Sequence, residues 1–173
     1  MFYPKGIISS LVTCFEGNGK LNLLGLTDNL RFQKKAGIKT VCVLGGTGEA
    51  ASLTETERHI IMKETMRGCE GMQVVFGALA GRPQEVMADI QQAKELGAAA
   101  CLVMAPPFVR PSESDVERLM ANYASLGMPL ILFNTPSRSG FSMSARLISR
   151  LAKLDEVVGI KESSGDMVLM QNI

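Results

Sequence analysis

Six short apolar segments recur along the chain, and segments with helical periodicity separate most of them. The apolar segments are residues 6–12, 40–46, 73–79, 99–107, 129–136 and 156–163. They are rich in β-branched residues and bounded by glycine, proline and polar residues, which predicts β-strands. From the second segment onward the apolar residues are nearly continuous rather than alternating. That pattern is typical of parallel strands covered by helices.

The segments between the strands predict helices. Apolar residues recur with a period near 3.6 over residues 55–69, 83–96, 112–125 and 142–151. Thr54 with Glu57 and Ser112 with Asp115 are capping signatures at the start of two of these helices. In all, six strands and six helices are expected, the last helix only begun. Repeating strand-helix units of roughly 30 residues indicate an α/β fold, either a βα barrel or a doubly wound sheet.

Composition and charge narrow the class of protein. The chain has 173 residues, of which 46% are hydrophobic and 20% charged, so we expect one domain over residues 1–173. The formal net charge is +1, and the basic residues are scattered among acidic ones. We therefore expect binding neither to nucleic acid nor to a membrane. The opening residues MFYPKGIISS lack the apolar run of a signal peptide, which favours a cytoplasmic location.

Cysteine and histidine usage argues against two kinds of site. The four cysteines lie in four separate segments with no C-x-x-C pair, so the sequence predicts neither a metal site nor a disulfide framework. His59 is the only histidine, and it lies within a predicted helix. This argues against a Ser-His-Asp or Cys-His nucleophile system.

Polar motifs follow the predicted strands. They are GGTGEA at residues 45–50, PPFVRP at 106–111, FNTPSRSG at 133–140 and KESSGD at 161–166. In a βα barrel the carboxyl ends of the strands form the face that binds substrate. Taken singly, each motif could be an ordinary turn or polar loop. Together the motifs provide the groups that can hold a keto acid, namely a nest of backbone N–H groups, Arg138 and the strand-end Lys161.

Three motifs in this order carry a family resemblance. GGTGEAASLTETER, FNTPSRSG and VVGIKESSGD resemble the dihydrodipicolinate synthase and N-acetylneuraminate lyase family of pyruvate-dependent class I aldolases. The resemblance implies a TIM (β/α)8 barrel, and it covers about the first six of its eight units. We therefore expect a single incomplete barrel domain, apparently truncated. If the chain is complete, we expect a homo-oligomer in which a partner covers the open edge of the sheet.

The same resemblance implies the roles of individual residues. Lys161 aligns with the lysine that forms a Schiff base with pyruvate or a related 2-keto acid. Thr47 and the backbone N–H groups around Gly46 and Thr47 would hold the keto-acid carboxylate, and Arg138 would grip a carboxylated aldehyde co-substrate. Lysine amines are protonated at neutral pH and must be desolvated or placed near positive charge to react, which the end of an apolar strand allows. No cofactor and no metal are implied.

Departures from the family pattern leave two alternatives open. Phe133 occupies the position at which the active enzymes have a tyrosine that shuttles protons. Phe108 replaces a second tyrosine of these enzymes, and Gly46 replaces a threonine. Loss of this relay favours a non-catalytic keto-acid-binding relative as the first alternative. The second is a dinucleotide-binding oxidoreductase, because residues 41–51 resemble a strand followed by a glycine turn. That turn follows the second strand rather than the first, which weakens this interpretation.

Overall fold

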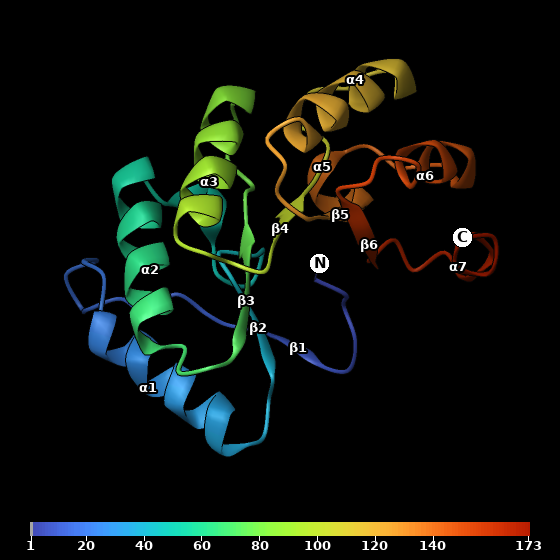
Figure 1. The fold of residues 1–173 in the computed structure, drawn as a ribbon. Helices are drawn as coiled ribbons and strands as arrows, with labels where there is room; N and C mark the ends of the chain where they lie inside the picture. The colour runs from blue at the N-terminus through green and yellow to red at the C-terminus, as the bar shows by residue number, and fades with distance from the viewer. Residues whose placement is uncertain (1) are drawn as a thin grey trace.

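The computed structural model describes residues 2–173 and contains one parallel sheet of six strands. The strands pair in chain order, and each lies within the segment predicted for it. Figure 1 shows the sheet curling into an arc, with the N-terminal segment in the opening between β1 and β6. The strands are β1 (Ile8–Ser10), β2 (Thr40–Val43), β3 (Gln73–Gly77), β4 (Ala100–Val103), β5 (Leu130–Asn134) and β6 (Val157–Glu162). This is a partial TIM barrel, as the sequence predicts.

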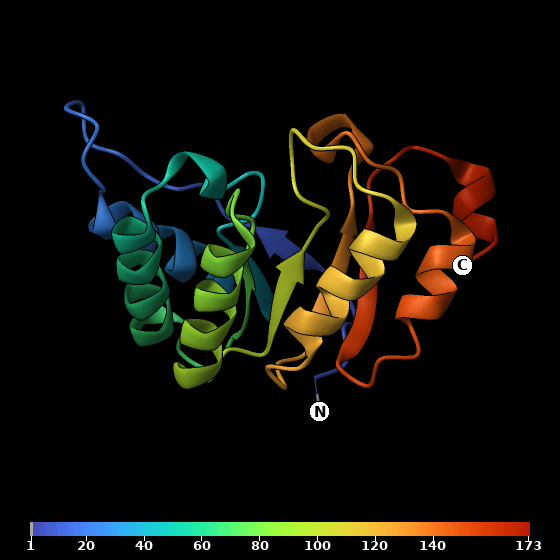
Figure 2. The same cartoon turned by 90° about the horizontal axis from the view of Figure 1, so that it is seen from above.

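Helices cover the outer side of the arc. The helices are α1 (Leu23–Lys35), α2 (Glu55–Gly68), α3 (Pro83–Glu95), α4 (Glu113–Ala124), α5 (Pro136–Ser139), α6 (Ala145–Leu151) and α7 (Met167–Gln171), with a 3-10 turn η1 (Ala50–Ser52). Figure 2 shows α2, α3, α4 and α6, green to orange, side by side along the outer side of the arc. Over the described residues, none of these helices combines the length and apolar character needed to cross a membrane.

The predicted helix starts are confirmed at two capping boxes and need correction at one helix. The side chains of Thr54 and Ser112 accept from the backbone N–H three residues on, as their sequence signatures predict. The helix expected from residue 142 begins instead at Ala145, with Ser144 as its N-cap. Met143 is held outside the helix because its N–H donates to Asn134 Oδ1 at 2.9 Å.

Burial differs between the middle and the edges of the sheet. Every residue of β2, β4 and β5 is buried, and in β3 only Gln73 is exposed. All residues of β1 and β6 are half-buried, because each of these strands has a neighbour on one side only among the described residues. The N-terminal segment partly covers β6, since a Cβ placed on Gly159 would lie 3.2 Å from Pro4 Cγ.

A buried ion pair joins α2 to α3 on the outer side of the sheet. Arg58 Nε donates to Asp89 Oδ2 at 2.8 Å, and both side chains are almost fully buried. His59 Nε2 lies 3.3 Å from Asp89 Oδ1. Burial raises the pKa of the Asp89 carboxyl, and the guanidinium of Arg58 opposes that rise. The only histidine of the chain thus lies in the packing between α2 and α3.

Candidate active site

The glycine-rich turn after β2 presents backbone N–H groups at the carboxyl end of the sheet. Leu44 and Glu49 take left-handed conformations, with φ of 60° and 56°, and fold the chain back on itself. Gly48 N donates to Gly45 O at 3.1 Å and closes the turn. Among the described residues, the N–H groups of Gly46 and Thr47 donate to no protein acceptor. These two N–H groups are therefore available to an acceptor from outside the chain.

The end of β5 carries Phe133 and leads into the short helix α5. Phe133 is 4% exposed. Asn134 anchors this strand end: its Nδ2 donates to Glu162 Oε2 at 2.7 Å, while its Oδ1 accepts from Met143. Thr135 and Pro136 then start α5, which carries Arg138. The segment FNTPSRSG is therefore partly helical, and the helix gives Arg138 a defined direction.

Lys161 lies on β6 directly beside Phe133 in the ladder. Its Nζ is 4.6 Å from the centroid of the Phe133 ring, a cation–π contact. Glu162, the next residue, points toward Asn134 and the N–H of Ser164. Burial tends to raise the pKa of Glu162, but hydrogen bonds from Ser164 and Asn134 outweigh it and lower the pKa. The neighbouring carboxylate is thus engaged in fixing the strand end.

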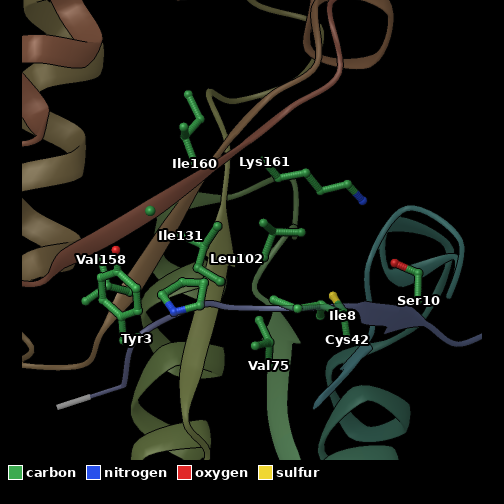
Figure 3. A pocket seen from close by; sticks show the side chains of 13 residues that line it. Tyr3, Ile8, Ser10, Cys42, Val75, Leu102, Ile131, Val158, Ile160 and Lys161 are labelled. Carbon is green, nitrogen blue, oxygen red and sulfur yellow. The ribbon is translucent and has the colours of Figure 1, made fainter. Parts of the chain in front are cut away.

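The inner side of the arc encloses a cavity of about 520 Å³ that Lys161 enters from β6. Figure 3 shows the Lys161 side chain extending across this space toward Ser10 and Cys42, with Leu102 and Val75 on the wall below. Burial raises the pKa of the Cys42 thiol, and the positive charge of Lys161 partly offsets that rise. The amine therefore faces a mainly apolar cavity with a hydroxyl and a neutral thiol on its far side.

A second chamber of about 370 Å³ adjoins the glycine turn. Gly46, Phe133 and Arg138 line it together, and so does Phe108. Arg138 Nη1 is 3.4 Å from Gly46 O, which is long for a hydrogen bond. Phe133 lines this chamber, and its ring also contacts the amine of Lys161, which lines the larger cavity.

The predicted site residues therefore divide between two adjoining spaces. Lys161 lines the larger cavity, whereas Gly46, Phe133 and Arg138 line the smaller chamber. Thr47 has an exposed side chain and lines neither space. Sequence reasoning missed Ser10 and Cys42. Their signal was a polar residue and a thiol within apolar strands, but only the pairing of Ser10 with Cys42 shows that they lie side by side.

Comparison with known proteins decides the family. The family model described as "Dihydrodipicolinate synthetase family" matches residues 3–173 of the chain. The chain belongs to this family. A 4-hydroxy-tetrahydrodipicolinate synthase from Methanosphaerula palustris is 33% identical over 172 residues, which cover 98% of this chain and 59% of the relative. The family resemblance inferred from the three motifs is thus confirmed.

Solved structures of family members share this fold. Dihydrodipicolinate synthase from Bacillus anthracis superposes with a TM-score of 0.93 at 25% identity, over 99% of this chain and 60% of that one. A prophage protein of the dihydrodipicolinic acid synthase family from E. coli K12, in complex with pyruvate, superposes with a TM-score of 0.93 at 25% identity. The match covers 96% of this chain and 57% of that protein. This family member therefore spans less than two thirds of the length of these relatives.

Proposed function

We propose that this dihydrodipicolinate synthase family member forms a Schiff base between Lys161 and pyruvate or a related 2-keto acid. The observation that carries the proposal is the position of the Lys161 amine. It projects from the carboxyl end of β6 into a cavity of about 520 Å³, beside the Phe133 ring. A pyruvate complex of a related protein supports the choice of keto acid.

Schiff-base formation needs a neutral amine and several proton transfers. The unprotonated Lys161 amine attacks the ketone carbon, and the resulting carbinolamine loses water to give a protonated imine. Loss of a proton from the adjacent methyl group gives an enamine, which attacks the carbonyl carbon of an aldehyde. Because Phe133 has no hydroxyl beside the amine, another group or water must move these protons. We therefore expect slow imine chemistry compared with an enzyme that has the full relay.

The keto-acid carboxylate would bind at the glycine turn. The N–H groups of Gly46 and Thr47 have no protein acceptor among the described residues, so a carboxylate can accept from them without displacing a bond. The exposed side chain of Thr47 makes its backbone, rather than its hydroxyl, the main contributor. Arg138 in the adjoining chamber would bind the carboxylate of an aldehyde co-substrate.

Association of copies of this chain is part of the proposal. Phe108 is fully exposed and has a left-handed φ of 65°. An exposed aromatic side chain held in an unusual backbone conformation supports a contact with another protein surface. We therefore propose a homo-oligomer.

Reductive trapping tests the Schiff base. Incubation with pyruvate and borohydride should add one reduced pyruvyl group to the chain, and peptide mass spectrometry should place it on Lys161. Lys161→Ala should abolish the labelling. Lys153→Ala, which removes an exposed lysine after α6, is the matched control and should leave the labelling intact. Labelling spread over several lysines would show ordinary surface amines and would reject the proposal.

A keto-acid-binding protein without turnover is the second candidate. The phenylalanine beside the Lys161 amine favours it, since no relay hydroxyl lies at that position. Pyruvate binding measured by calorimetry, together with the absence of both trapping and turnover, would select this candidate. The family match gives no support to the dinucleotide-binding interpretation.

A further inference from the structure

Imine formation moves two protons from nitrogen to oxygen. The ammonium form of Lys161 carries three protons on nitrogen, whereas the protonated imine carries one. The ketone oxygen leaves as water, so both protons that nitrogen gives up end on this oxygen. The balance closes without an external acid or base, but each transfer needs a group that accepts one proton while it donates another. A hydroxyl group can do both.

Ser10 brings a hydroxyl to the cavity that the Lys161 amine enters. Both residues line this cavity, and Figure 3 shows the Lys161 side chain extending toward Ser10 and Cys42. Ser10 and Cys42 are direct partners in the ladder between β1 and β2. Because paired residues point to the same face of a sheet, both side chains lie on the inner side of the arc.

The Cys42 thiol contacts the Ser10 hydroxyl and lies near the amine. Its side chain takes part in a hydrogen bond with that of Ser10, and the charge of Lys161 acts on it. Burial nevertheless raises the pKa of the Cys42 thiol, so the thiol keeps its proton at neutral pH. A neutral thiol can orient the hydroxyl, but it cannot take protons from the amine.

The rest of the cavity wall offers the amine no comparable group. Its other large side chains are mostly apolar, namely Ile8, Val75, Leu102, Ile131, Val158 and Ile160. Tyr3 also has a hydroxyl, but Figure 3 shows its ring beside Val158, on the other side of the cavity from the Lys161 amine. Among the described residues that line the cavity, Ser10 therefore has the hydroxyl best placed to serve the amine.

We propose that the Ser10 hydroxyl relays protons from the Lys161 nitrogen to the departing oxygen during imine formation, and that Cys42 is its positioning residue. The inference rests on the proposed Schiff base. Attack of the neutral amine on the ketone leaves a positive nitrogen and a negative oxygen. The hydroxyl accepts a proton from this nitrogen while its own proton passes to the oxygen, which gives the carbinolamine.

The same hydroxyl serves the loss of water. It passes to the carbinolamine oxygen the proton that the lysine ammonium released to water before the attack. The carbon–oxygen bond then breaks, the nitrogen lone pair forms the imine double bond, and Ser10 is left unchanged. One hydroxyl replaces only part of a relay, so a second hydroxyl added at Phe133 is still expected to increase the rate.

Single-turnover trapping measures the rate of imine formation, with pyruvate reactions stopped by borohydride at timed intervals. We expect Ser10→Ala to lower this rate about tenfold or more, the lower range for a positioned acid-base group. Ser10→Thr keeps a hydroxyl and should retain most of the rate. Ser9→Ala is the matched control, because Ser9 is also half-buried in β1 but lies outside the cavity lining. It should leave the rate unchanged.

A double-mutant cycle and an unreactive ligand test the role of Cys42. Cys42→Ala should slow imine formation about threefold, the effect of losing one neutral hydrogen bond. In the Ser10→Ala background it should slow the reaction no further, because the hydroxyl that it positions is already absent. Oxamate, an analogue of pyruvate that forms no imine, should bind all these variants as tightly as the unchanged chain.

The outcomes separate this inference from the Schiff base itself. An unchanged rate in Ser10→Ala, with Lys161 still labelled, would reject the inference alone and leave water as the carrier of the protons. Equal losses in Ser10→Ala and Ser10→Thr, or a matching loss of oxamate affinity, would show an effect of packing and would also reject it. Additive losses in the double variant would reject the role of Cys42. Absence of trapping in the unchanged chain would reject the Schiff base, and the role of Ser10 with it.

Discussion

The four inner strands and the two edge strands of the sheet differ in both packing and chemistry. Strands β2 to β5 are buried almost throughout, and they supply the apolar wall of the cavity. Strands β1 and β6 are half-buried, yet they contribute Ser10 and Lys161. A charged amine at a half-buried edge keeps access to water, whereas in the inner strands it would be fully desolvated. The lysine that we propose as the Schiff-base residue therefore lies on a strand less tightly packed than the apolar wall that it faces.

Substitution of a glycine in an inner strand and of one in an edge strand should give the largest difference in the free energy of unfolding. A Cβ on Gly77, in the inner strand β3, would lie 2.0 Å from Leu44 O, and this backbone atom cannot move aside locally. A Cβ on Gly159, in the edge strand β6, would lie 3.2 Å from Pro4 Cγ, in the N-terminal segment. We expect Gly77→Ala to cost more than about 4 kcal/mol or to prevent folding, and Gly159→Ala to cost about 1 kcal/mol.

Urea unfolding of both variants measures this difference in the free energy of unfolding. Gly81→Ala is the control, because an added Cβ there meets nothing within 4 Å. Its free energy of unfolding should stay within about 0.5 kcal/mol of that of the unchanged chain. Similar losses for Gly77→Ala and Gly159→Ala would mean that inner and edge strands are packed equally tightly.

Two residues paired across the β5 and β6 ladder give the next largest effect. Leu132 and Ile160 are directly opposite each other, but Leu132 is 1% exposed, whereas Ile160 is half-buried. Leu132→Ala should cost about 2–5 kcal/mol, the range for a large residue removed from a core. Ile160→Ala should cost about 1 kcal/mol, because its surroundings are already open to solvent. Equal losses in urea unfolding would indicate that β6 is covered in solution, for example by another copy of the chain.

The parts of the fold that depend on local sequence patterns could be predicted, whereas those that depend on tertiary contacts could not. All six strands and the capping boxes at Thr54 and Ser112 depend on local patterns, and they were predicted correctly. The predicted start of α6 was wrong by three residues, because the helix is capped by Ser144 and the N–H of Met143 donates to Asn134 Oδ1 outside the helix. Both Ser142 and Ser144 are plausible caps by residue type, and only the contact with Asn134 separates them.

The sequence singles out candidate site residues one by one but not their arrangement in space. Lys161 could be picked out because it ends an apolar strand, and Arg138 because it follows one. The family resemblance implied their roles. That Lys161 lines one cavity and Arg138 another, with Phe133 in contact with the Lys161 amine, depends on how the strands pack in three dimensions. The contact between Gly46 and Arg138 joins residues 92 positions apart, and neither local pattern contains it.

The smallest expected effect concerns Phe133, where the inner strand β5 meets the edge strand β6. Phe133→Tyr adds one oxygen to a ring that is 4% exposed and whose centroid lies 4.6 Å from the Lys161 amine. A positioned acid-base group typically contributes 10² to 10⁴ in rate, so a gain of about tenfold in imine formation is a conservative expectation. Single-turnover trapping of pyruvate measures this rate. Phe141→Tyr, which adds the same oxygen outside both spaces, is the control and should leave the rate unchanged.

The opposing effect is the burial of a hydroxyl without a partner. Gly46 and Phe108 provide no side-chain hydroxyl to pair with it, and an unpaired buried hydroxyl costs about 1–3 kcal/mol. If stability falls and the rate does not rise, while Lys161 is labelled to the same final extent in both proteins, the missing relay hydroxyl does not limit imine formation. That result would favour the keto-acid-binding protein over the enzyme. A tenfold gain would instead show that the edge strand already holds a competent lysine, and that its neighbour on the inner strand limits the chemistry.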